Sequence, residues 1–162
     1  MVLYRLIFLI GFFSHLSAGF PEIVVDIYNN SIDVIEIVEK KNLIIITLKN
    51  PRCPVCQNQL IRIRENFNKF ALCNVSFLVL TSGENSNIED AQIKTEFPFP
   101  FINDINFTIT DELELRLNEN EIIPSLILID NDLNIKWKQL GRNQFYFGDK
   151  ELLKLLDCEN MI

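Results

Sequence analysis

Short apolar runs separated by polar and turn-forming residues follow one another along this chain. The run Leu43-Ile44-Ile45-Ile46, within residues 42–49, is continuously apolar, as is typical of a strand buried on both faces of a sheet. Two further runs, SFLVLT and SLILID, have the same character, and a turn separates the second from an apolar segment that contains Trp137. The pattern predicts strands over residues 42–49, 76–81, 125–130 and 135–140.

A different period follows the first strand. Apolar side chains recur at steps of four, three, four and three, which places them on one face of a helix, at Cys56, Leu60, Ile63, Phe67 and Phe70. Pro54 suits the first helical position and biases Cys53 away from helical angles, so Cys53 should cap the helix at its exposed edge. Other sides of the helix should carry the polar residues Gln57, Asn58, Arg62, Glu65 and Lys69.

Three more helices complete the predicted elements. They cover residues 87–96, ended by Phe97-Pro98-Phe99-Pro100, then Thr110 as a cap through about Asn118, and Asp149 through Leu156. The alternation predicts an α/β domain. Within it, residues 43–81 form a strand–helix–strand unit whose strands should be parallel.

The segment Cys53-Pro54-Val55-Cys56 is the candidate thiol redox site of the chain. Two cysteines separated by two residues can close a small disulfide ring, and N–H groups at a helix N-terminus lower the pKa of a thiol there. The thiolate is the nucleophile of disulfide exchange. We therefore expect Cys53 to attack and Cys56 to resolve the mixed disulfide. Arg52 either favours the Cys53 thiolate by its charge or is a solvated loop residue.

The remaining cysteines bear on the alternatives for this motif. A zinc site would need two more ligands, yet Cys73 and Cys158 stand alone and the single histidine, His15, lies in the N-terminal apolar segment, so no metal is predicted. A structural CPVC disulfide or two inert thiols is a further alternative. We expect Cys73 and Cys158 to be unpaired; the alternatives are a second disulfide between them, or Cys158 as the resolving cysteine of a peroxidase.

The order of elements resembles the thioredoxin fold over residues 22–157, beside a tail at residues 158–162. Ile123-Pro124-Ser125 stands before the SLILID strand, where thioredoxin-like proteins place a cis-proline that faces the CxxC motif. The resemblance implies a central mixed sheet with helices on both faces. It also implies a cis bond between Ile123 and Pro124, with both residues forming a substrate groove.

Within that fold, the chain resembles the alkyl hydroperoxide reductase and thiol-specific antioxidant branch, which includes membrane-tethered periplasmic thiol reductases. The resemblance rests on residues 26–48 and on the segments FPFPFINDINFTITDELELRL and PSLILIDNDLNIKWKQLGR. The peroxidases of this branch have a threonine where Cys53 stands if Cys56 is aligned with their reactive cysteine, and their arginine falls near Pro124. These differences favour disulfide exchange. Thioredoxin's tryptophan and buried acid are replaced by Arg52 and Thr47, so no proton acceptor for Cys56 is identified.

The main hypothesis is thus a thiol–disulfide oxidoreductase that acts on protein or small-molecule disulfides, receives electrons from an unidentified thiol donor and needs no cofactor. The alternatives are a thiol peroxidase of the same branch and a non-catalytic secreted binding module with a structural CPVC disulfide. With 48% hydrophobic residues in 162, the chain can bury a full core. Its net charge of −7, with scattered Lys and Arg, argues against nucleic acid.

The N-terminal segment has the order of a secretory signal. Arg5 precedes an apolar run over residues 6–13, and the small residues Ser17-Ala18-Gly19 follow, so residues 1–19 are predicted to be a signal peptide cleaved near Gly19. An uncleaved anchor that tethers the domain to a membrane, or a first element of a cytosolic domain, is the alternative. The expected location is extracellular or periplasmic, with weak support from the glycosylation sequons at Asn29, Asn74 and Asn106.

Overall fold

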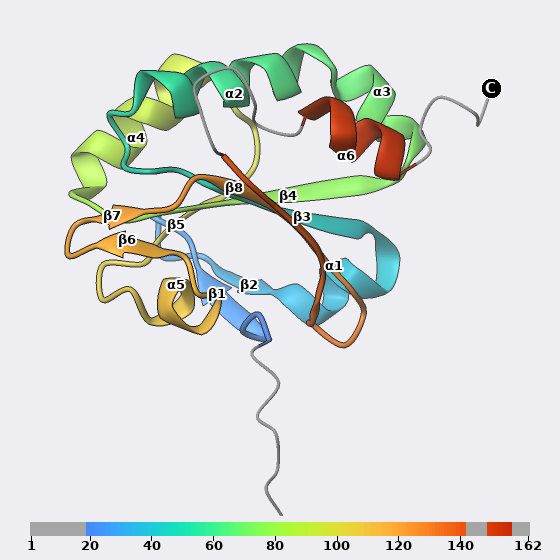
Figure 1. The fold of residues 1–162 in the computed structure, drawn as a ribbon, viewed down its shortest axis with the longest axis horizontal. Coiled ribbons are helices and arrows are strands. Elements are labelled where there is room, and N and C mark those ends of the chain that lie inside the picture. Colours follow the sequence, from blue (N-terminus) through green and yellow to red (C-terminus); the bar gives the residue numbers. More distant parts are fainter. Residues whose placement is uncertain (1–18, 142–148, 157–162) are drawn as a thin grey trace, which may run out of the picture.

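A five-stranded mixed sheet organises the molecule. The computed structural model describes residues 19–141 and 149–156. In the order β5-β4-β3-β8-β9, the first three strands are parallel and the last two run antiparallel to their neighbours (Figure 1). The strands are β3 (Asn42–Thr47), β4 (Val75–Thr81), β5 (Phe101–Asn103), β8 (Ser125–Ile129) and β9 (Ile135–Leu140). The predicted α/β, thioredoxin-like class with a mixed sheet is confirmed.

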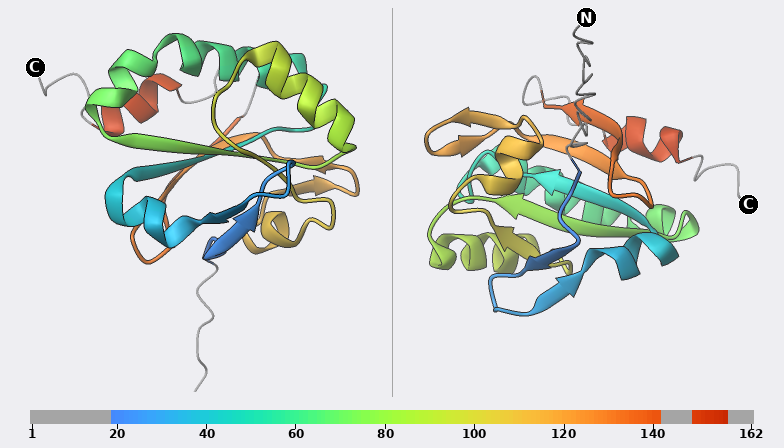
Figure 2. Two further views of the ribbon diagram at one scale, coloured as in Figure 1. Left: turned by 180° about the vertical axis from the view of Figure 1, so that it is seen from behind. Right: turned by 90° about the horizontal axis from the view of Figure 1, so that it is seen from below.

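Helices cover both faces of the sheet (Figure 2). One layer consists of α2 (Pro54–Glu65), α3 (Phe67–Leu72), α4 (Asn85–Thr95) and α6 (Asp149–Leu155). The other contains α1 (Val34–Lys40), α5 (Thr108–Glu112) and the hairpin of β1 (Ile23–Val25) and β2 (Ser31–Asp33), while β6 (Arg116–Asn118) and β7 (Glu121–Ile122) form a second hairpin. No described helix is long and apolar enough to cross a membrane.

Strand β3 explains why the sheet is covered twice. Every residue from Leu43 to Thr47 is fully buried. Ile44 and Ile46 pack into the core under α2 and α4, whereas Leu43 and Ile45 pack into the core under α1. Side chains alternate across a strand, so a continuous apolar run can fill both cores. The prediction of a strand buried on both faces is confirmed.

Two predicted helices differ from the structure. The helix expected from Pro54 through Phe70 is divided at Asn66, whose side-chain Nδ2 donates to the carbonyl oxygen of Arg62 at 2.8 Å. Thr110 does not cap a helix that reaches Asn118: it lies inside the short helix α5, and its hydroxyl donates to Asp104 Oδ2 at 2.7 Å. Buried Asp104, and not Thr110, accepts hydrogen bonds from backbone N–H groups of the first turn of α5, those of Ile109 at 3.3 Å and Thr110 at 2.7 Å.

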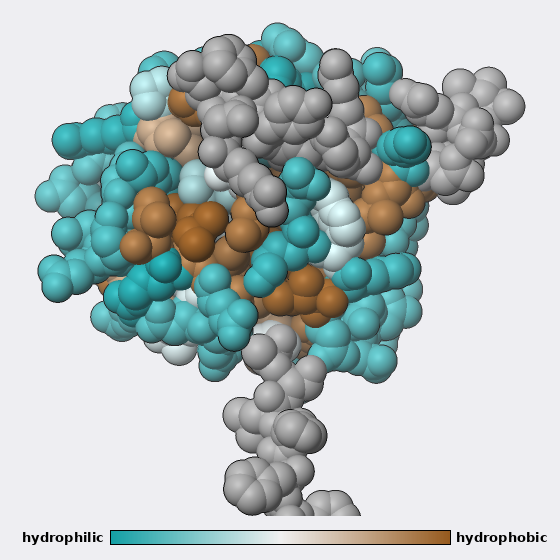
Figure 3. All heavy atoms as spheres, in the orientation of Figure 1, coloured by the Kyte–Doolittle hydropathy of each residue, from teal (hydrophilic) through white to brown (hydrophobic). Residues whose placement is uncertain are grey.

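Most of the view in Figure 3 is hydrophilic, with hydrophobic residues gathered in a few patches. The apolar core begins at Phe20, which is 3% exposed and whose N–H donates to the carbonyl oxygen of Leu133 at 2.8 Å. Residues 1–18, which are all but the last residue of the predicted signal peptide at 1–19, and the predicted tail at 158–162 lie outside the described residues.

Candidate active site

The CPVC segment lies where β3 ends and α2 begins. Cys53 is the N-cap of α2 and has extended backbone angles, and its Sγ accepts a hydrogen bond from the backbone N–H of Cys56 at 3.3 Å. Pro54 occupies the first helical turn, as its fixed φ allows. The expected cap is therefore present. The Cys53 sulfur accepts the capping hydrogen bond that a serine or aspartate oxygen accepts at many helix N-termini.

Cys56 points into the core under the helix. It is fully buried, and its Sγ accepts a hydrogen bond from the backbone N–H of Lys49 at 3.4 Å. The hydrogen bond between its thiol and Cys53, and then burial, raise the pKa of Cys56. Cys56 thus stays a neutral thiol, which fits the expected resolving role.

Cys53 has the lower pKa of the pair. Its side chain is half-buried, and both cysteines are free thiols. The hydrogen bond from the Cys56 thiol is the largest influence that lowers the pKa of Cys53, to about 6, and the backbone N–H groups of Cys56 and Val55 and the charge of Lys49 act in the same direction against burial. Cys53 is therefore largely a thiolate at neutral pH.

The loop before the motif is held from two sides. Asn50 Oδ1 accepts from the N–H of Arg52 at 3.0 Å, and the buried amide of Gln57 donates to the carbonyl oxygen of Pro51 at 2.7 Å. Gln57 is 7% exposed, so the expectation that it lies on a polar side of the helix is wrong. A hydrophobic period cannot identify a buried amide whose partner is a loop carbonyl. Behind the loop, Gly83 has φ of +158°, and a Cβ there would lie 3.1 Å from the Pro51 ring.

Two cations, Arg52 and Lys49, precede Cys53 in the sequence and have different partners. The Arg52 guanidinium donates to Asn87 Oδ1 on α4, at 3.1 Å from Nε and 2.9 Å from Nη2. Lys49, in contrast, pairs with Glu121 on β7, with 3.1 Å between Nζ and Oε1, and is the charged residue that lowers the pKa of Cys53. The sequence suggests Arg52 for this role, because it directly precedes the motif, and no local pattern points to Lys49.

Ile123 and Pro124 lie at the same edge of the sheet as the motif. The N–H of Ile122 donates to the carbonyl oxygen of Lys49 at 3.0 Å, and the Thr47 hydroxyl donates to the carbonyl oxygen of Ile123 at 2.7 Å. The predicted cis bond is wrong: the described residues contain no cis peptide, so the bond between Ile123 and Pro124 is trans. Trans is the ordinary state of such bonds, and the family placement was the only argument against it.

Two further polar groups bear on the predictions. Thr47 stands in place of a buried acid. Its hydroxyl oxygen lies 2.7 Å from that of Ser125, so this position supplies no carboxylate.

Cys73 is 4% exposed, with its sulfur 3.4 Å from the carbonyl oxygen of Leu156. It is disulfide-bonded, contrary to the expected free thiol, while Cys158 lies outside the described residues. The described residues contain no cluster of three or more potential metal ligands.

Comparisons with known proteins point to one family. The profile described as the AhpC/TSA family matches residues 20–138 of this chain. No curated protein matches the sequence. The profile match covers the CPVC segment, the loop before it and the edge of the sheet where Pro124 lies.

Solved structures of similar fold have low sequence identity. Peroxidoxin BcpB from Mycobacterium tuberculosis has a TM-score of 0.71 at 13% identity, over 89% of this chain and 95% of that chain. The reduced 2-Cys peroxiredoxin of Plasmodium vivax has a TM-score of 0.72 at 14% identity, over 87% and 93%. The bacterioferritin comigratory protein of Xanthomonas campestris, studied for alkyl peroxide reduction, has a TM-score of 0.71 at 12% identity, over 88% and 94%. At these identities the likeness establishes the fold.

Proposed function

This chain belongs to the AhpC/TSA family, a family of thiol-dependent oxidoreductases, and from that premise we propose that it is a thiol peroxidase that reduces hydroperoxides. The carrying observation is a half-buried thiol of lowered pKa at a helix N-cap, Cys53, with a second free thiol one turn away, Cys56. From the sequence alone, disulfide exchange is the main hypothesis. The comparisons support the peroxidase alternative better, because the similar structures are peroxiredoxins.

The first step oxidises Cys53. Its thiolate attacks one oxygen of the hydroperoxide, the O–O bond breaks, and the sulfur gains that oxygen as a sulfenic acid. The other oxygen leaves as an alkoxide or hydroxide and takes a proton from solvent, so the peroxide is reduced by two electrons to an alcohol or water. A pKa of about 6 keeps the attacking form present at neutral pH.

The second step uses Cys56. Its sulfur attacks the sulfenic sulfur of Cys53, the S–O bond breaks, and the proton of the Cys56 thiol leaves with the hydroxide as water. The product is a Cys53–Cys56 disulfide, which an external thiol donor returns to two thiols by exchange with two electrons. The resolving thiol is within the same helical turn, so this disulfide forms inside one chain.

Thiol–disulfide exchange remains a second candidate, favoured by one observation. If Cys56 is aligned with the reactive cysteine of the peroxidases of this branch, Cys53 stands where they have a threonine and their arginine falls near Pro124, which favours the two-thiol chemistry of a reductase. The backbone of Ile122 and Ile123 borders the same edge of the sheet, where an extended disulfide substrate would lie. The binding-module alternative would need a permanent disulfide between Cys53 and Cys56.

The rates at which the two kinds of substrate oxidise the protein distinguish the two candidates. In separate reactions at equal substrate concentration, the reduced full chain is mixed with hydrogen peroxide or a small organic hydroperoxide, or with a protein disulfide such as insulin, and the loss of thiols is followed over time. We expect faster oxidation by the peroxides, with one Cys53–Cys56 disulfide formed per peroxide consumed. Faster oxidation by the protein disulfide would contradict the peroxidase proposal and leave the reductase.

We also propose export of the chain through the secretory route, on the charged, apolar and small-residue order of residues 1–19. N-terminal sequencing of the native protein tests this, with a mature start near Phe20 expected. An intact Met1 in a cytosolic fraction would contradict it.

A further inference from the structure

We infer that Lys49 and Glu121 together control the reactivity of Cys53, with the Lys49 ammonium as the cation of the site and the Glu121 carboxylate as the group that positions it and offsets its charge. The inference rests on the proposed function in so far as Cys53 is the nucleophile. It concerns a lysine two residues past the end of β3 and an acidic residue of the β6–β7 hairpin, 72 positions later in the sequence.

Lys49 contacts the buried thiol, strand β7 and Glu121. Its backbone N–H donates to Cys56 Sγ at 3.4 Å, and its carbonyl oxygen accepts from the N–H of Ile122 at 3.0 Å. Its main chain is therefore fixed between the buried thiol and β7. The side chain starts from this fixed point and reaches Glu121, with 3.1 Å between Nζ and Oε1.

Glu121 is itself held by several donors. Besides the Lys49 ammonium, Asn50 Nδ2 donates to Oε1 at 3.3 Å and Asn118 Nδ2 donates to Oε2 at 2.8 Å. These hydrogen bonds, that of Asn118 first, lower the pKa of Glu121, so the carboxylate stays charged. Asn50 connects this arrangement to the reactive loop, because its own backbone carbonyl accepts from the N–H of Cys53 at 3.2 Å.

The other charged groups around the loop have partners elsewhere. The Arg52 guanidinium is bound to Asn87 on α4, and Asn87 in turn donates to Glu84 Oε2 at 3.0 Å. Lys49 is thus the cation whose charge favours the Cys53 thiolate, after the hydrogen bonds from Cys56 and Val55. Glu121 competes with the thiolate for this ammonium, since both are negative.

Two substitutions should therefore have opposite effects. Lys49→Met removes the cation and should raise the pH at which Cys53 is half-ionised by about half a unit, since exposed charges shift a pKa less than buried ones. Glu121→Gln keeps an oxygen that can accept from Asn50 and Asn118 but removes the competing charge, so it should lower the same midpoint. A merely structural disturbance of the loop would move both variants in one direction.

The experiment measures the pH dependence of Cys53 alkylation in the reduced full-length chain, with each labelled cysteine identified by mass spectrometry. Lys49→Arg should keep the wild-type midpoint because it retains the charge. The matched control is Lys40→Met, which removes another lysine paired with a glutamate, 2.7 Å from Glu36 at the far end of the sheet. In 1 M salt the shift of Lys49→Met should shrink, because the pair is partly exposed.

The inference is overturned if Lys49→Met leaves the midpoint unchanged, if Glu121→Gln raises it, or if Lys40→Met shifts it as far as Lys49→Met does. Alkylation does not depend on the natural substrate. If the protein does not consume peroxide but the two variants shift the alkylation midpoint of Cys53 in opposite directions, the peroxidase proposal is refuted and this inference is kept. If the protein consumes peroxide normally but the variants do not shift the midpoint, this inference is refuted and the peroxidase proposal is kept.

Discussion

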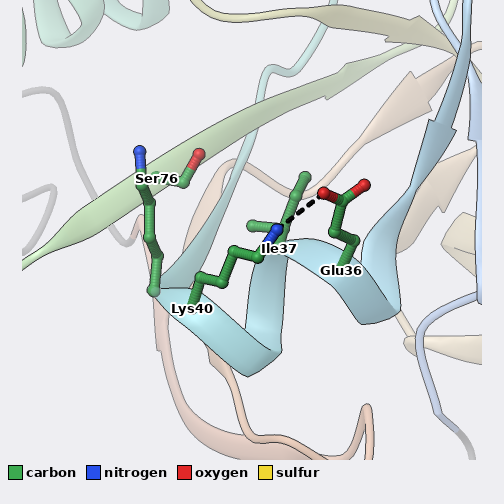
Figure 4. Close-up of a pocket in the computed structure, with 5 residues that line it drawn as sticks. Glu36, Ile37, Lys40 and Ser76 are labelled. Carbon is green, nitrogen blue, oxygen red and sulfur yellow. Dashed lines mark hydrogen bonds and ion pairs between the residues drawn. The ribbon is translucent and has the colours of Figure 1, made fainter.

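The two ends of β3 have similar components but different chemistry. At its C-terminal end lie Cys53 and Cys56 and the Lys49–Glu121 pair, with 3.1 Å between charged atoms. At its N-terminal end, α1 and β4 border a hollow of about 280 Å³, where Lys40 pairs with Glu36 at 2.7 Å (Figure 4). Its lining residues are Glu36, Ile37, Lys40, Lys41 and Ser76.

Helix polarity explains the difference. The reactive end receives the N-terminus of α2, whose free N–H groups stabilise a thiolate, whereas the hollow lies beside the C-terminal end of α1, whose carbonyls favour a cation such as Lys40. The Lys40 and Glu36 side chains are 62% and 66% exposed, against 41% and 25% for Lys49 and Glu121. A hollow and an ion pair do not make a site without a nucleophile beside them.

Removal of the nucleophile should have the largest effect. Cys53→Ser replaces the thiolate by a hydroxyl that stays protonated at neutral pH, so peroxide consumption should fall on the order of a thousandfold or more. Consumption of hydrogen peroxide in the presence of a thiol donor is the measurement. Cys56→Ser is the comparison within the site: it should consume one equivalent, leave a trappable sulfenic acid on Cys53, and then recycle poorly. Full activity of Cys53→Ser would assign the chemistry to Cys56.

The second-largest effect should be the difference in alkylation rate between Cys53 and Cys56. Cys53 should be alkylated at least about tenfold faster than buried Cys56 in the reduced protein, because the thiolate reacts and only Cys53 is both ionised and accessible. Its labelling rate should rise with a midpoint near pH 6 and then level off, since the pKa of Cys53 is lowered to about 6. An ordinary thiol keeps gaining reactivity up to about pH 8.5. Equal labelling of both cysteines at pH 7 would contradict the assignment.

A smaller effect concerns the loop that holds the reactive end. Gln57→Leu leaves the carbonyl oxygen of Pro51 without its buried donor and should lower the free energy of unfolding by about 1–3 kcal/mol. Asn58→Leu, at the neighbouring exposed position, is the matched control and should change it little. Chemical denaturation of the reduced chain measures both. A cost for Asn58→Leu as large as for Gln57→Leu would mean that the buried hydrogen bond is not the cause.

The fold could be predicted from the sequence because its strongest signals are local. The apolar run at 43–46 and the helical period through Ile63 correspond to β3 and α2, and both depend on which side chains must leave water. The signal failed where a polar side chain overrides the period: Asn66 divides the predicted helix, and Asp104, not Thr110, accepts hydrogen bonds from the first turn of α5.

The site was predictable only where it is contiguous. Cys53, Pro54 and Cys56 lie in one segment, so spacing alone gave the cap and the buried thiol. Lys49 and Glu121 are 72 positions apart and meet only because β7 folds back onto the end of β3, which no local pattern expresses. The trans bond before Pro124 shows the converse, since a placement taken from a family did not fix the local geometry.

The smallest effect should come from the hollow. Lys40→Met breaks an exposed i,i+4 pair with Glu36, and such pairs contribute little because water solvates both partners and salt screens them. We expect no resolvable change in peroxide consumption or in the alkylation midpoint of Cys53, and at most a small, salt-dependent change in melting temperature. Parallel measurements on Lys40→Met and Lys49→Met complete the comparison of the two ends. If Lys40→Met reduced peroxide consumption as strongly as Lys49→Met, the hollow would belong to the functional site, and reactivity could no longer be assigned to the helix N-terminus and the Lys49–Glu121 pair alone.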